Sequence, residues 1–109
     1  MVDVIADIGG THARFALWDG REDIAISTRL QAVQTFLTRD FASLAQAATA
    51  YCDGQQIQPE RLCLAVAGPV ETDRIIMSNN DWSFSKTALK QTLLLDSLCV
   101  INDFTAQAL

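Results

Sequence analysis

Two polar stretches of the sequence combine residue types that could bind or transform an anionic ligand, and the first runs from Asp7 to Thr11. It stands between two apolar runs that are typical of strands. The consecutive glycines Gly9 and Gly10 predict a tight hairpin whose backbone N–H groups can approach a phosphate, because no Cβ intervenes. A carboxylate beside a phosphate is repulsive unless a cation lies between them, so Asp7 indicates a magnesium–nucleotide site. The alternative is an ordinary hairpin turn in which Asp7 is merely polar.

The second polar stretch is Asn102-Asp103, which directly follows the apolar run from Leu98 to Ile101. A carboxylate at the end of a buried strand lies at the edge of a sheet, where Asp103 could act as general base toward a hydroxyl nucleophile. Because a carboxyl pKa of about 4 is far below that of an alcohol, the proton would move late, as the bond to phosphorus forms. Asn102 offers a donor and an acceptor to a sugar hydroxyl. The alternative, compatible with this role, is that the pair caps the following helix.

A third stretch, from Met77 to Trp82, places four small polar side chains and an aromatic residue in a predicted loop. Such a set is typical of a polyol pocket, although an ordinary turn before the next helix is the simpler interpretation. Trp82 is expected to plug the core rather than to form a platform for a ligand. His12, the single histidine, could touch a nucleotide beside the first loop, but a structural role is the favoured interpretation.

The length and composition indicate one folded domain at most, large enough for a core of its own but with little to spare. Of the 109 residues, 50% are hydrophobic and 19% are charged, which argues against disorder. The net charge is −5 and the basic residues are scattered, so no basic stripe exists for a nucleic acid backbone to follow. We therefore expect no nucleic acid partner, and an anionic ligand would be held by backbone N–H groups and a metal.

The cysteines, the first residues and the lengths of the apolar runs indicate where in the cell the protein is expected to reside. Three cysteines stand far apart with no Cys-x-x-Cys pair, which argues against a zinc site or a disulfide framework. They are expected to be small core residues in a reducing cytosol. No basic region opens the chain as in a signal peptide, and no apolar run reaches the roughly 20 residues that cross a bilayer. The expectation is a soluble cytoplasmic protein without a membrane partner.

Hydrophobic periodicity predicts the order of the secondary structure. The expected strands cover residues 1–6, 13–18, 24–30, 62–67, 74–77 and 98–101, and the expected helices cover residues 40–53, 85–94 and 104 onward. The run over 62–67 is nearly continuous, as in a strand that is buried on both faces, and it stops at Gly68-Pro69. Ser85 is the predicted N-cap of its helix.

This order predicts an α/β domain with a mixed sheet, in which an antiparallel three-strand meander is followed by parallel strands and flanking helices. In such sheets, ligands bind at the carboxyl edge of the parallel strands. Gly68, Asn102 and Asp103 all follow predicted strands. They are therefore expected to lie at that edge.

With these residues in place, the sequence resembles the bacterial glucokinases of the hexokinase/actin-like ATPase superfamily. The blocks that carry the resemblance are 7–17, which begins Asp-Ile-Gly-Gly-Thr, 65–70, 77–85 and 100–106, which contains Asn-Asp-Phe-Thr. The resemblance implies an RNase H-like (actin-like ATPase) fold, with residues 1–109 forming the N-terminal small domain and a second domain absent. Family members are roughly three times as long, so the isolated fragment is expected to be inactive.

The resemblance also implies the ligands and the residues that bind them: ATP with Mg²⁺ and glucose, in a reaction that yields ADP and glucose 6-phosphate at the start of glycolysis. The implied ATP-binding residues are Ala6, Asp7, Ile8, Gly9, Gly10 and Thr11, with Asp7 acting through Mg²⁺. Asn102, Asp103 and Asn79 would bind glucose, and Asp103 would be the base for its 6-hydroxyl. His12 stands where the family's commonest pattern has Asn. Apolar surface that the second domain would cover favours association, so a homodimer is one expectation.

Two rival functions are compatible with parts of this pattern. An RNase H-like nuclease would need Asp7 and Asp103 to share two metal ions beside a basic track, and the acidic balance argues against it. A sugar-sensing regulatory domain would bind glucose without turnover. Such proteins usually carry a DNA-binding element ahead of the phosphate loop, for which six residues before Asp7 leave no room.

Overall fold

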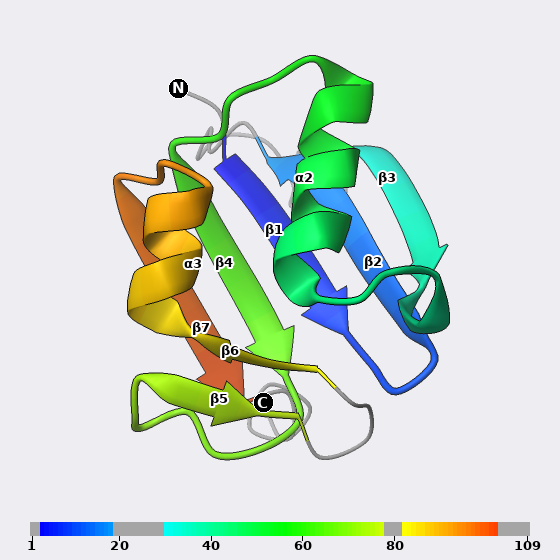
Figure 1. The fold of residues 1–109 in the computed structure, drawn as a ribbon. Coiled ribbons are helices and arrows are strands. Elements are labelled where there is room, and N and C mark those ends of the chain that lie inside the picture. The colour runs from blue at the N-terminus through cyan, green and yellow to red at the C-terminus, as the bar shows by residue number, and fades with distance from the viewer. Residues whose placement is uncertain (1–2, 19–29, 78–81, 103–109) are drawn as a thin grey trace.

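The computed structural model describes residues 3–18, 30–77 and 82–102. Within them, five strands form one sheet in the order β3-β2-β1-β4-β7, and β5 and β6 form a small second sheet. The elements are β1 (Asp3–Ile8), β2 (His12–Trp18), β3 (Leu30–Leu37), the 3-10 helix η1 (Thr38–Asp40), α2 (Leu44–Gln55), β4 (Arg61–Val66), β5 (Arg74–Ile76), β6 (Ser83–Ser85), α3 (Lys86–Thr92) and β7 (Ser97–Asn102). Both α helices cover the same face of the large sheet (Figure 1). The predicted mixed α/β sheet is confirmed.

The first three strands form the predicted antiparallel meander, and β4 and β7 follow in parallel to β1. Residues 24–29 of the predicted third strand lie outside the described part of the chain, and β3 extends from Leu30 to Leu37, beyond the predicted end. Its signal is weak because β3 is an edge strand whose residues 31–35 are all exposed. Such a strand does not show the alternation of apolar and polar residues that marks a half-buried one.

The core lies between the sheet and the two helices. Phe15 on β2 is fully buried and stacks on Tyr51 of α2, with ring centroids 5.3 Å apart. The Tyr51 hydroxyl donates to the carbonyl of Ala32 on β3, which satisfies the one polar atom of that buried ring. Helix α2 begins at Leu44 rather than at residue 40, because η1 precedes it and the Ser43 Oγ accepts a hydrogen bond from the Gln46 N–H as N-cap.

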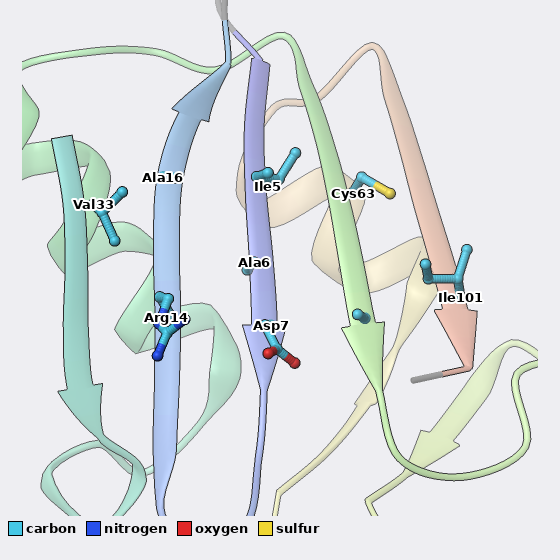
Figure 2. A pocket seen from close by; sticks show the side chains of 9 residues that line it. Ile5, Ala6, Asp7, Arg14, Ala16, Val33, Cys63 and Ile101 are labelled. Atoms are coloured by element: carbon cyan, nitrogen blue, oxygen red, sulfur yellow. The ribbon is translucent and has the colours of Figure 1, made fainter. Parts of the chain in front are cut away.

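The opposite face of the large sheet carries apolar side chains that the described residues leave partly uncovered. Val33 is 55% and Ile101 is 40% exposed there, and Figure 2 shows them with Ile5 and Cys63 on this face. Strand β4 therefore alternates between a buried face and a half-buried one, whereas its sequence predicted burial on both faces. Among the described helices, none has both the length and the apolar character needed to cross a membrane.

The cysteines divide between the two faces, and all three are free thiols. Cys52 is buried in α2, as its apolar neighbours predict. The prediction is wrong for Cys99, which is exposed, and holds in part for Cys63, which is half-buried. The reason is that β4 and β7 place these two side chains on the uncovered face of the sheet.

The start of α3 confirms the predicted N-cap. The Ser85 Oγ accepts a hydrogen bond from the Ala88 N–H and donates one to the carboxylate of Asp73. Asp73 also accepts hydrogen bonds from the N–H and the hydroxyl of Thr87, at 2.9 and 2.7 Å. The bonds from Ser85 and then Thr87 hold the pKa of the Asp73 carboxyl below its ordinary value. Asp73 thus ties the chain before β5 to the first turn of the helix.

We expect Asp73→Asn to lower the urea midpoint of unfolding at pH 7, because the amide accepts fewer hydrogen bonds than the carboxylate. A carboxyl whose pKa is lowered by folding stabilises the fold above its unfolded pKa of about 4 and loses that contribution as the pH falls through its folded pKa. The difference between the variant and the unmodified chain should therefore shrink from pH 7 to pH 3. Asp96→Asn, at an exposed carboxylate, is the control. A difference that is independent of pH would contradict this account.

Candidate functional site

The two polar stretches of the sequence meet at one edge of the large sheet. Strands β1, β4 and β7 are parallel and in register, so that Ile8 pairs with Val66 and Val66 pairs with Asn102. Their carboxyl ends consequently lie side by side, with the β1–β2 hairpin next to them (Figure 1). The expectation that Gly68 and Asn102 lie at this edge is confirmed, and the structure adds a hydrogen bond between them. Asp103 and Asn79 lie outside the described residues, so their expected positions stay predictions.

The loop between β1 and β2 is a tight hairpin, as its glycines predict. The Gly9 N–H donates to the carbonyl of His12 at 2.8 Å and closes the turn. A Cβ at Gly9 would lie 3.3 Å from that carbonyl oxygen, a tight contact that glycine avoids. The N–H groups of Gly10 and Thr11 donate to no other residue of the described part of the chain. These two groups, rather than that of Gly9, are the donors suited to a phosphate.

Thr38 holds the tip of this hairpin in place from η1. Its hydroxyl donates to the carbonyl of Gly10 at 2.9 Å and to that of Thr11 at 3.3 Å. Its backbone N–H donates to the Thr11 carbonyl at 2.9 Å. Thr38 is 7% exposed, and it is one of two buried polar residues in the described chain. Because both carbonyls are bound from behind, the loop is preorganised for a ligand that contacts its N–H groups.

A hollow of about 240 Å³ adjoins the hairpin, and its lining residues are Asp7, Gly9, Gly10, Thr11, His12 and Arg14. Asp7 and Arg14 are paired across β1 and β2, and both are exposed. Figure 2 shows their side chains beside each other on the uncovered face of the sheet. Sequence reasoning missed Arg14, although its place opposite Asp7 follows from the hairpin register. The exposed His12 lies at the hollow and not in the core, which favours contact with a ligand.

The chemistry of these groups fits a phosphate with its metal. A carboxylate oxygen is the ligand type that Mg²⁺ prefers, and Mg²⁺ in nucleotide sites usually keeps several waters and one or two carboxylates. Asp7 would supply that carboxylate. The guanidinium of Arg14 matches the geometry and charge of phosphate oxygens. One carboxylate, one guanidinium and two backbone donors thus surround a space that an anion and a cation together could occupy.

Asn102 binds the turn that follows β4. Its Nδ2 donates to the carbonyl of Gly68 at 2.5 Å, over 34 residues of sequence. Gly68 has a φ of 133°, a conformation that side-chain-bearing residues rarely adopt. The hydrogen bond orients the Asn102 amide at the carboxyl edge of the sheet.

Trp82 is 5% exposed and its Nε1 donates to the carbonyl of Phe41, which confirms that its ring plugs the core.

Replacing Thr38 by valine removes the hydroxyl at nearly constant shape and leaves the Gly10 carbonyl without this donor. We expect the free energy of unfolding to fall by about 1 kcal/mol, the typical contribution of a protein hydrogen bond, as measured by urea denaturation. Thr35→Val makes the same change at an exposed position of β3 and should leave stability unchanged or slightly higher. Equal effects of the two substitutions would refute the role of the Thr38 hydroxyl.

Comparisons with known proteins show which family the chain belongs to. The family model for Glucokinase matches residues 4–109. A glucokinase of Erwinia tasmaniensis is 41% identical over 103 residues, covering 94% of this chain and 30% of that protein. One of Psychromonas ingrahamii is 38% identical over 105 residues, covering 96% of this chain and 31% of that protein.

A solved structure shows the same similarity in three dimensions. The crystal structure of a glucokinase from an Antarctic psychrotroph superposes with a TM-score of 0.83 at 38% identity, covering 96% of this chain and 33% of that one. The chain spans about 30% of the length of the curated relatives it matches. The family match over residues 4–109 and these likenesses show that the chain belongs to the glucokinase family.

Proposed function

We propose that this chain is the N-terminal small domain of a glucokinase, which transfers the terminal phosphoryl group of ATP to the 6-hydroxyl of glucose. The observation that carries the proposal is the meeting of the Asp7–Thr11 hairpin with Asn102 at one edge of the sheet. A phosphate loop next to a polar group suited to a sugar hydroxyl is the arrangement that phosphoryl transfer between ATP and a sugar requires. Membership of the family supports the same reaction.

The proposed roles follow the chemistry of each group. The N–H groups of Gly10 and Thr11 and the guanidinium of Arg14 bind phosphate oxygens, and Asp7 holds Mg²⁺ on the same hollow. When bound, Mg²⁺ neutralises charge on the phosphates. Asn102 binds a sugar hydroxyl, and Asp103 accepts the proton of the 6-hydroxyl as the new bond forms. Positioning and charge neutralisation supply most of the catalysis in such transfers.

We also propose the finer assignment of the fold as RNase H-like, in the manner of the actin-like ATPases. The antiparallel meander, the strands β4 and β7 that run parallel to β1, and the helices α2 and α3 that precede these two strands in the chain support it. Magnesium dependence, a place in glycolysis, a cytoplasmic location and a homodimer stay predictions. A sugar-binding regulator without turnover is the second candidate, because the same edge of the sheet could bind glucose without transferring phosphate.

The first test is turnover by the glucokinase that contains this chain, measured as glucose-dependent release of ADP with Mg²⁺ present. We expect Asp103→Asn to lower kcat by about 10²- to 10⁴-fold, the usual contribution of a general base. Asp53→Asn, at an exposed carboxylate of α2, should leave kcat unchanged. Full turnover in Asp103→Asn would overturn the assignment of the base. No sugar-dependent ADP release from the unmodified protein, over a panel of hexoses, would favour the regulator instead.

A second test separates the sugar side of the site from the nucleotide side. Gly68→Ala forces a side chain into a backbone conformation that costs about 1–3 kcal/mol, and this would displace the carbonyl that orients Asn102. We expect the KM for glucose to rise by roughly tenfold, since about 1.4 kcal/mol corresponds to a factor of ten, while the KM for ATP stays within twofold.

Gly54→Ala is the matched control for this test, because a Cβ at that helical position meets no atom within 4 Å. It should leave both KM values unchanged. An unaltered glucose KM in Gly68→Ala would show that the Gly68–Asn102 hydrogen bond does not position the sugar.

A further inference from the structure

Two cysteines that the proposed function does not use lie next to each other on neighbouring strands of the large sheet. Cys63 on β4 and Cys99 on β7 are in-register partners on neighbouring parallel strands. Side chains at such positions leave the sheet on the same side. The Cys99 thiol is, after burial, a cause of the raised pKa of the Cys63 thiol, so the two side chains interact. Since 36 residues separate them in sequence, their contact depends entirely on the fold.

The pair lies on the uncovered face of the sheet, where a reagent can reach it. Both cysteines line a hollow of about 270 Å³ together with Ile5 and Trp18. Cys99 is exposed and Cys63 is half-buried. The bidentate ion pair of Asp3 with Arg61, at 2.9 and 2.7 Å, adjoins the same hollow. The site therefore combines two thiols with apolar walls that suit an aromatic or other apolar substituent.

The spacing of the strands favours a bridging atom over a disulfide. Neighbouring strands lie about 4.8 Å apart, and parallel partners keep their Cβ atoms at about that separation. A disulfide needs a Cβ–Cβ distance of about 3.8 Å, so the strands would have to approach by about 1 Å. With sulfur–metal bonds of about 2.3 Å, one central atom bridges sulfurs that lie roughly 3–4 Å apart. The strands can hold such a bridge without moving.

We propose that Cys63 and Cys99 form a dithiol site for a single thiophilic centre, such as trivalent arsenic or a soft metal ion, bridging β4 and β7. Burial and the hydrogen bond with Cys99 raise the pKa of the Cys63 thiol to about 11, so this thiol carries its proton at neutral pH. With an arsenic(III) oxide of the type R–As=O, two As–S bonds form and the arsenic–oxygen bond breaks. The two thiol protons leave with the oxygen as one water, and no atom changes its oxidation state.

Phenylarsine oxide is the probe, added in equimolar amount to the folded chain and followed by intact mass. We expect one phenylarsine group per chain, retained in excess 2-mercaptoethanol and released by 2,3-dimercaptopropanol, because only a second chelating thiol competes with a two-sulfur bridge. Cys63→Ser and Cys99→Ser should each shorten the lifetime of the adduct in 2-mercaptoethanol by at least tenfold. Cys52→Ser, which alters the cysteine on the helix-covered side, should change it by less than twofold.

A measurement in urea separates the folded geometry from general thiol reactivity. In an unfolded chain, loop closure favours the pair Cys52 and Cys63, 11 residues apart, over the pair 36 residues apart by about sixfold. Peptide mapping should therefore find the bridge on Cys63 and Cys99 in the folded chain and mainly on Cys52 and Cys63 in urea.

If a serine variant fails to fold, peptide mapping of the unmodified chain still shows which two cysteines form the bridge. A bridge that includes Cys52 in the folded chain would overturn the proposal. An adduct that survives 2-mercaptoethanol equally well in Cys99→Ser would overturn it too.

Discussion

The parallel, in-register alignment of β1, β4 and β7 is the constraint on which the rest of the structure depends. It brings the carboxyl ends of three strands to one edge, so that residues near positions 8, 66 and 102 become neighbours. Parallel strands need long crossover connections, and α2 and α3 supply them while covering the same face of the sheet. The apolar packing of α2 and α3 on the sheet therefore holds the residues of the candidate site in position, although this packing lies away from the site itself.

Hydrogen-bond pairing decides which backbone groups of the β1–β2 hairpin remain available to a ligand. Gly9 uses its N–H to close the hairpin, and Thr38 binds the carbonyls of Gly10 and Thr11 from the opposite side. The hairpin is thus held through its carbonyl oxygens. The N–H groups of Gly10 and Thr11 therefore stay available to an anion. Arg14 places a positive charge opposite Asp7 in a chain whose net charge is −5.

Helices cover one face of the large sheet. On its other face, residue types that usually belong to a core remain partly exposed. Apolar side chains such as Ile101 stay partly exposed, and two cysteines that would be inert in a core lie side by side in reach of solvent. The same strand, β4, contributes Leu62 and Leu64 to the packed core and Cys63 to the open face. Because successive side chains of a strand point to opposite faces, Leu62 and Leu64 pack in the core while Cys63 between them lies on the open face.

The sequence by itself determined the features whose signals are local: the β1–β2 hairpin at its glycines, the Ser85 cap of α3, the order of the elements and the motifs of the glucokinase family. The residues of the edge strand β3 after Leu30 were not predicted as strand, because they are largely exposed and carry no apolar alternation. Only the tertiary structure decided that Thr38 clamps a loop 27 to 28 residues earlier and that Asn102 reaches Gly68. Such contacts depend on strand register and on which face a helix covers, which are settled by packing of the whole core rather than by neighbours along the chain.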